Sequence, residues 1–140
     1  MLTTQLARDL AAAGVLWQPA AGDRFIIDAE LLTDEVFWIS DLTVEVYHYE
    51  GQSLLGFNGT TEWALDAVTL DQALWLPRED QLRQLLGDRL LWVNPAGNRW
   101  EVRYTVGDAP RTVSDSDLEC AYARAILSLD GGPGGLSSPA

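Results

Sequence analysis

The chain has 140 residues, which is the size of one ordinary domain and enough to bury a sizeable core. Twenty-one acidic residues against nine arginines give a formal charge of −12, and the chain contains no lysine. This balance, with the arginines scattered among carboxylates, disfavours nucleic acid and an anionic membrane as partners, and the missing lysine excludes a phosphate loop, a Schiff base and a lysine general base.

The first predicted element is a helix over residues 3–13. Thr3 or Thr4 can cap its first turn with a side-chain oxygen, and Gly14 can end it in a left-handed conformation. The turn-rich run WQPAAGD then separates this helix from four segments of strand character, which lie at 24–28, 36–40, 43–49 and 53–57.

The strand predicted over 43–49 has two different faces. The valines and His48 share one face, which is predicted to point into the core, while Tyr47 and Tyr49 share the other. Only three residues separate this strand from the one over 53–57, so the two are predicted to form a hairpin.

The stretch GFNGTTEWALDAV, residues 56–68, follows that hairpin. It indicates a strand end, a capping residue at Thr60, and a short helix that carries Glu62 in its first turn and buries Trp63 or Leu65. The brief extended segment ALWLP comes next, before a helix predicted over PREDQLRQLLGD, which Gly87 ends.

The clearest hairpin is RLLWVNPAGNRWEVRYTV, in which NPAGN is the turn. Its second arm alternates a core-facing set, Trp100, Val102, Tyr104 and Val106, with an outward set, Arg99, Glu101, Arg103 and Thr105. The last helix is predicted to begin after RTVSDSD, with Ser114 as its cap and Asp117 three residues on.

These elements predict an α+β fold with a mainly antiparallel sheet of about six strands, formed by meanders and hairpins, and with N-terminal, inserted and C-terminal helices. Residues 1–130 are predicted to be a single domain. Residues 131–140, GGPGGLSSPA, are predicted to be a flexible tail, because they contain too few apolar groups to order themselves.

No catalytic set is predicted. A single histidine, His48, and a single cysteine, Cys120, cannot assemble the usual zinc ligands within one chain, and no Ser nucleophile motif is present. Cys120 lies beside core positions of the last helix, so it is predicted to be a small buried hydrophobe, and His48 is predicted to be a partly buried, hydrogen-bonded side chain.

The carboxylates leave one alternative open. Glu62 and Asp66 lie four residues apart on the predicted helix, and Asp41 and Glu45 can join them if that helix folds back over the sheet. Such an oxygen-only cluster suits Mg²⁺, Ca²⁺ or Mn²⁺ and would make the chain a metal-dependent hydrolase or small-ligand enzyme. A solvated acidic face without a metal or cofactor is the favoured interpretation.

The aromatic residues divide into core and surface. Trp38, Trp92 and Trp100 occupy strand positions that can point inward, and each is predicted to fill the core. Tyr47, Tyr49 and Trp63 are either covered by a helix or exposed together, and in the second case they form a contact patch of the kind found at interaction hot spots.

The runs AGVLWQPAAGDRF, DEVFWISDLTVEVY, GFNGTTEWALD and LWLPREDQLRQLLG occur in this order within residues 10–90. The ordered set resembles a group of short bacterial proteins from high-GC genomes that carry the label pilus assembly protein of the CpaE type. The lysine-free composition fits such a genome. The resemblance implies a family but no site residue.

The leading functional expectation is a non-catalytic cytoplasmic protein that binds another protein, as an inhibitory or adaptor module, through an acidic and aromatic surface. The candidate binding residues are Tyr47, Tyr49, Glu62, Trp63 and Asp66, and a basic partner is one version. A homodimer formed by pairing of sheet edges is a further alternative. The cytoplasmic expectation comes from the lone cysteine and from the lack of a signal peptide or membrane span in this sequence.

Overall fold

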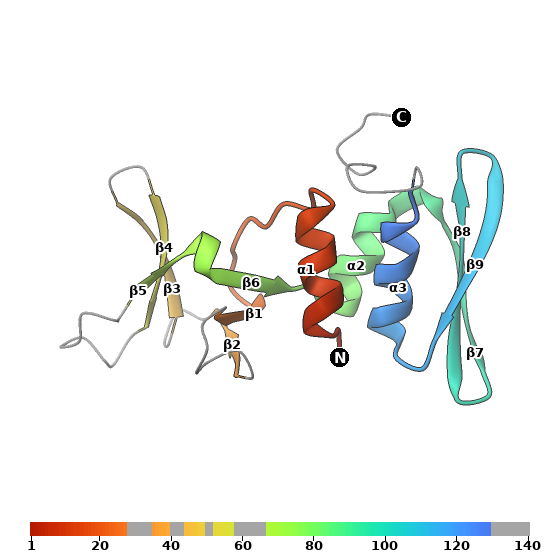
Figure 1. The fold of residues 1–140 in the computed structure, drawn as a ribbon, viewed down its shortest axis with the longest axis horizontal. Coiled ribbons are helices and arrows are strands. Elements are labelled where there is room, and N and C mark those ends of the chain that lie inside the picture. Colours follow the sequence, from red (N-terminus) through yellow and green to blue (C-terminus); the bar gives the residue numbers. More distant parts are fainter. Residues whose placement is uncertain (28–34, 40–43, 50–51, 58–66, 130–140) are drawn as a thin grey trace. The chain divides into compact units, whose positions relative to one another are not determined.

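The computed structural model describes residues 1–27, 35–39, 44–49, 52–57 and 67–129 (Figure 1). It divides into two compact units: unit 1 comprises residues 1–16 and 77 onward, and unit 2 is the intervening segment Trp17–Leu76. The predicted class, α+β with antiparallel strands and with N-terminal, inserted and C-terminal helices, is confirmed. The prediction of one domain over residues 1–130 stays a prediction, and the predicted tail lies outside the described residues.

Unit 1 contains three helices and one antiparallel sheet. The helices are α1 (Thr4–Ala12), α2 (Glu79–Leu86) and α3 (Leu118–Leu127). The sheet has the order β7-β8-β9, with β7 (Leu90–Ala96), β8 (Arg99–Val106) and β9 (Ala109–Asp115) joined by two hairpins. A 3₁₀ turn, η2 (Gly87–Arg89), links α2 to β7.

The core of unit 1 lies where α3 packs on β8 and β9, with α1 and α2 packed against α3 in turn (Figure 1). Ala121, Ala123 and Ala125 of α3 are completely buried, and such small side chains let a helix be covered from several directions. Val102 and Tyr104 of β8 are also buried, as predicted, while Trp100 and Val106 of the same predicted set are only partly buried.

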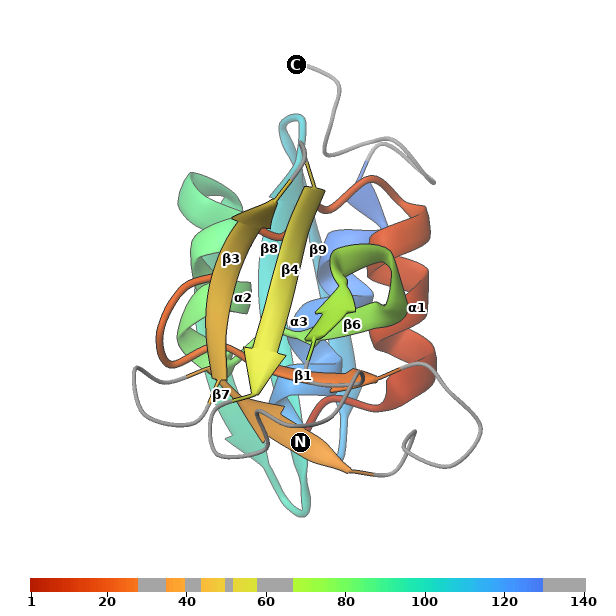
Figure 2. The same cartoon turned by 90° about the vertical axis from the view of Figure 1, so that its left-hand side faces the viewer.

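Unit 2 contains two antiparallel sheets of three strands. The first has the order β2-β1-β6, with β1 (Arg24–Ile27), β2 (Val36–Trp38) and β6 (Ala73–Leu76). The second has the order β3-β4-β5, with β3 (Val44–Tyr49), β4 (Gln52–Phe57) and β5 (Ala67–Thr69); Figure 2 faces the β3–β4 pair. The 3₁₀ turn η1 (Leu70–Gln72) joins β5 to β6.

Every residue of β1 is buried, because β1 is the central strand of its sheet. Phe25, Ile26 and Leu76 are the innermost apolar side chains of this unit, with 0%, 2% and 1% of their surface exposed. The apolar run RFII is thus typical of a fully buried strand rather than of one with a solvent face.

The helix ends match the sequence in two of three cases. Thr3 caps α1, since its side-chain oxygen accepts a hydrogen bond from the amide of Leu6, and α2 ends at Gly87, whose φ of 57° is left-handed. The prediction of Ser114 as the cap of α3 was wrong. Asp117 is the cap, and its carboxylate accepts a hydrogen bond from the amide of Cys120.

Two strands were not predicted. Residues 67–69, the end of the stretch assigned to a short helix, form β5, while residues 58–66 lie outside the described residues. Residues 109–115, read as the approach to the last helix, form β9, which pairs with β8 along its whole length.

The prediction that Trp38 and Trp92 fill the core was also wrong. Both lie on edge strands, β2 and β7, and 50% and 42% of their surfaces are exposed. Trp92 follows the bulge of β7 and stands opposite Arg103, on the face of the sheet opposite to that of the buried Tyr104. Trp38 stands opposite Arg24 on a strand that has a neighbour on one side only among the described strands.

Prolines and a bulge mark both edges of the β7–β9 sheet. Pro95 lies in β7, Pro110 lies in β9, and the register of β7 against β8 shifts between Leu90 and Trp92. A proline cannot donate to a further strand, and a bulge bends the edge away from one. Both features oppose extension of this sheet by a second copy. In the part of the chain that the structure describes, no helix is long and apolar enough to cross a membrane.

Candidate functional site

The residues predicted to bind a partner are only partly within the described structure. Tyr47 and Tyr49 lie in β3, where they pair with Leu54 and Gln52 of β4, and their two-residue spacing places them on one face of the strand. Their side chains, and the whole of Glu62, Trp63 and Asp66, lie outside the described part. The predicted contact patch therefore stays a prediction.

The residues of the alternative metal cluster also lie mostly outside the described structure. Asp41, Glu62 and Asp66 lie outside the described residues, and of Glu45 only the backbone is described, opposite Gly56 in the β3–β4 pair. Among the residues with a described placement, no group of three or more His, Cys, Asp or Glu side chains could hold a metal ion.

Cys120 lies in a structural environment. It is buried in the first turn of α3 with 3% of its surface exposed, and its thiol donates to the carbonyl of Met1 over 3.9 Å. Burial raises the pKa of this thiol above its ordinary value, since a thiolate would lose its hydration there. The thiol form is therefore favoured at neutral pH, which agrees with the predicted role as a small buried hydrophobe.

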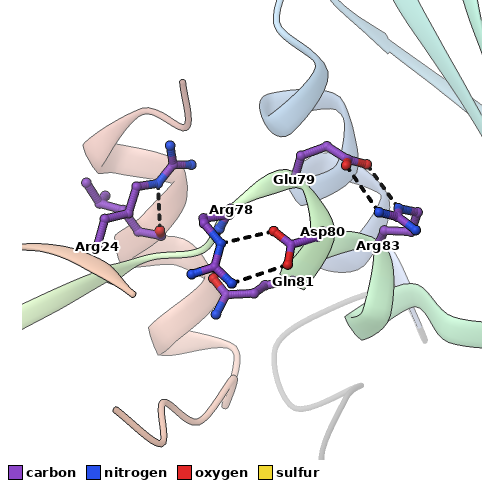
Figure 3. Close-up of polar contacts among 7 residues, drawn as sticks. Arg24, Arg78, Glu79, Asp80, Gln81 and Arg83 are labelled. Carbon is purple, nitrogen blue, oxygen red and sulfur yellow. Dashed lines mark hydrogen bonds and ion pairs between the residues drawn. The ribbon is translucent and has the colours of Figure 1, made fainter. Parts of the chain in front are cut away.

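The ionisable side chains at the start of α2 pair with one another (Figure 3). The Arg78 guanidinium donates to both carboxylate oxygens of Asp80, at 3.0 and 3.2 Å, and thereby holds the pKa of that carboxyl below its ordinary value. One turn on, Arg83 donates to Glu79 at 3.2 Å. The Gln81 side chain accepts from the Arg78 amide at 2.9 Å, which completes the cap of the helix.

The single arginine of unit 2, Arg24, is turned inward. Only 7% of its surface is exposed, its Nε donates to the carbonyl of Leu76 at 3.0 Å, and its guanidinium carbon lies 5.9 Å from the centre of the Trp38 ring. A guanidinium over an indole face is a cation–π contact, so this charge is used inside the β2-β1-β6 sheet.

Asp23, the residue before Arg24, organises an aromatic cluster. Its carboxylate is buried and accepts from the Trp17 indole at 2.9 Å and from the Ala20 amide at 3.1 Å. The Trp17 ring stacks on Trp75 with a centroid separation of 6.3 Å and also contacts Phe25 at 5.8 Å. The indole nitrogen of Trp75 is buried and has no hydrogen-bond partner in the described structure. The cluster thus packs unit 2 rather than displaying its rings.

The two units differ strongly in charge. Unit 2 contains eleven acidic residues and one arginine, a formal charge of −10, while the rest of the chain contains ten acidic residues and eight arginines, a formal charge of −2. Because Arg24 is buried, the positive charge of unit 2 contributes little to its surface. Composition alone carried this signal, but the division of the chain into units was needed to find it.

The outer face of the β7–β9 sheet has the opposite character. Arg99 and Arg103 of β8 lie on the face that α3 does not cover, as the alternation predicted, and both lie across β9 to reach hydroxyl groups. Trp92, which the register places directly opposite Arg103, extends this face onto β7. The alternation along β8 predicted the outward arginines, whereas nothing in the sequence pattern indicated that Trp92 joins them.

A search with protein-family models, a search of the curated proteins and a search of the solved structures each found no match to this chain. The resemblance to the group with the pilus-assembly label therefore stays a prediction.

Proposed function

We propose that this chain is a non-catalytic protein-binding module, in which unit 2 binds a basic partner protein. The observation that carries the proposal is the uneven charge: unit 2 holds −10 of the total of −12, and its one arginine is turned into its own core. A surface of one sign attracts a partner of the other sign and can raise the association rate by roughly 10 to 10³.

The described ionisable groups support a binding role rather than a chemical one. Asp80 and Glu79 are paired with arginines, Asp23 accepts from an indole, and Cys120 is a buried thiol. The contacts of these side chains lie within a helix, a turn or a core.

The test is the affinity for a fluorescein-labelled arginine-rich peptide, measured by fluorescence anisotropy. The variant E35Q/D71N removes two exposed charges from unit 2, and D88N/D108N removes two exposed charges from unit 1 as the matched control. We expect the first variant to weaken binding about two- to thirtyfold, since each of its two exposed charge pairs contributes about 0.2–1 kcal/mol, and the second variant to change it less.

A second pair of variants tests the predicted contact patch within unit 2. If Tyr47, Tyr49, Glu62, Trp63 and Asp66 form the docking surface, E62Q/D66N should weaken binding more than E35Q/D71N does, although both remove two charges. Equal effects of all three charge variants, or binding that does not weaken from low to moderate salt, would contradict the proposal.

A further inference from the structure

The outer face of the β7–β9 sheet is built from rows of side chains that the strand register defines. One row contains Trp92, Arg103 and Thr112, and the next contains Asn94, Glu101 and Ser114. Arg99 stands opposite Ala96 at the end of β8. Directly opposed residues of antiparallel strands point to the same side, so these residues share one surface. We call it the arginine face, defined by Trp92, Arg99, Glu101, Arg103, Thr112 and Ser114.

The two arginines of this face are held in place but keep most of their donors. Arg103 donates to the Thr112 hydroxyl at 2.8 Å, and Arg99 donates to the Ser114 hydroxyl at 2.8 Å and to the Ser114 carbonyl at 3.1 Å. A guanidinium has five N–H donors in a planar fork, so donors remain on each for a ligand. The hydrogen bonds to β9 also reduce the conformational entropy that a ligand would have to remove.

Neither guanidinium is held by a carboxylate in the described structure, although Glu101 lies between them on the same face. Among the residues that the structure describes, neither Arg99 nor Arg103 forms an ion pair, in contrast to Arg78, Arg83 and Arg124. Arg99 makes only a weaker, more distant electrostatic contribution to Asp115. Both guanidiniums donate to neutral oxygens, those of Thr112 and Ser114.

Two exposed apolar side chains of β7 lie close to the arginines in the strand register. Trp92 is 42% exposed and its neighbour Leu91 is 49% exposed, at the bulge of β7. Tryptophan and arginine are the side chains most enriched among the residues that contribute most to binding at protein interfaces. The arginine face therefore joins a hydrophobic anchor to two directional cationic donors.

We propose that the arginine face binds an acidic, extended peptide segment of another protein. Four residues of a strand separate Arg99 from Arg103, which corresponds to about 13 Å. Two carboxylates four residues apart in an extended peptide have the same spacing, and each can accept the bidentate pair of hydrogen bonds that a guanidinium offers. Glu101 lies midway, so it repels a third carboxylate at the central position of the peptide.

The peptide lies across the face and does not add a strand to the sheet. Pro95 in β7 and Pro110 in β9 interrupt both edges, which disfavours recognition through backbone hydrogen bonds. Unit 1, which carries the arginine face, accounts for only −2 of the total charge of −12.

The test measures binding of a fluorescein-labelled peptide that has Glu at its first and fifth positions and Gln at its third, by fluorescence anisotropy with the whole chain. We expect R99Q and R103Q each to weaken binding about tenfold, and W92A to weaken it as well. R103K, which keeps the charge but loses the planar fork, should fall between wild type and R103Q. A peptide of the same composition with Glu at its first and third positions should bind less tightly than the probe.

The matched control is R111Q. Arg111 is exposed on β9 opposite Tyr104, so it belongs to the same sheet but to its other face, and the substitution removes the same charge. Its affinity should stay within twofold of wild type. Equal weakening by R111Q and R103Q, or no binding of the probe to the wild-type chain, would overturn the proposal. A dimer that R99Q/R103Q dissociates in sedimentation would also overturn it, because the face would then belong to a second copy.

The proposal is independent of the binding of a basic partner by unit 2. The two probes have opposite charge, and the variants lie in different units. Failure of either test leaves the other result unchanged.

Discussion

The Asp115 carboxylate shows how a single side chain in this protein balances burial against pairing. Its surroundings are partly buried, which raises the pKa of the carboxyl. The hydrogen bonds from Arg124 at 2.8 Å and from the Asp117 amide at 2.9 Å outweigh this effect, so the pKa is lowered below its ordinary value. The pair joins the end of β9 to α3, and it therefore links sheet to helix across one corner of unit 1.

A pH-dependent stability follows from that pair. A carboxyl with a lowered pKa in the folded state stabilises the fold above its unfolded pKa of about 3.9, and this contribution is lost as the pH falls through the folded pKa. R124Q should therefore lower the free energy of unfolding by about 0.2–1 kcal/mol at pH 7, since the arginine is half exposed. Urea denaturation should show this difference disappearing below pH 4.

The control for that experiment is again R111Q, which removes an exposed arginine from β9, the strand that carries Asp115. Its effect on the unfolding free energy should be small at every pH. A deficit of R124Q that stays constant down to pH 3 would show that the arginine acts by packing and not through the Asp115 charge.

At the scale of elements, α3 depends on the residue that begins it. Asp117 accepts from the amide of Cys120 at 3.0 Å, and Ser114, three residues earlier, is part of β9 and accepts from Arg99 instead. D117A should lower the unfolding free energy by about 1 kcal/mol, and D117N should restore most of it because asparagine caps a helix equally well. S114A should cost about 0.5 kcal/mol or less.

Thermal or urea denaturation followed by circular dichroism measures all three variants. A larger loss of unfolding free energy for S114A than for D117A would indicate that Ser114, as the sequence predicted, caps α3. D117A and D117N both remove the ion pair of Asp117 with the Met1 amino group, so the difference between these two variants reports the cap, and the difference between D117N and wild type contains the ion pair.

The sequence was sufficient for elements with a strong local signal. A few neighbouring residues are enough to predict the inward face of β8 and the start of α1, because periodicity and capping are local properties. The strand β9 carries no such signal: APRTVSD has one apolar β-branched residue and a proline, and it becomes a strand because the turn at Gly107, with a φ of 60°, folds it onto β8. The exposure of Trp38 follows from the edge position of β2, and that of Trp92 from the bulge that places it opposite Arg103; strand pairing decides both, and local sequence does not.

At the scale of the whole molecule, charge was readable from the sequence and its meaning was not. The count of −12 predicts attraction to a basic partner, but the split into −10 and −2 required the division into two units. The structure also separates a buried arginine, Arg24, from two arginines on an outer sheet face, Arg99 and Arg103. Only the second kind is available to a ligand. Binding surfaces are properties of assembled elements, and this limits what a linear pattern can predict about them.

One whole-molecule measurement separates a binding protein from a metal enzyme. The described carboxylates are paired or dispersed, so we expect calorimetric titration with Mg²⁺, Ca²⁺ and Mn²⁺ to give no heat of binding at millimolar metal. Micromolar affinity that D41N or E62Q abolishes would instead assign the cluster of Asp41, Glu45, Glu62 and Asp66 to a metal site and would contradict the proposed function. D88N serves as the control for a general loss of charge.

The insertion of unit 2 between α1 and the rest of unit 1 has a consequence for synthesis on the ribosome. Helix α1 packs on α3, yet α3 begins at Leu118, more than a hundred residues after α1 ends at Ala12. At ordinary translation speeds the nascent α1 waits roughly 5 to 20 s for its partner, while all six strands of unit 2 have already left the tunnel or entered it. Its apolar stripe of Leu6, Ala7 and Leu10 is therefore the segment that a chaperone would meet first.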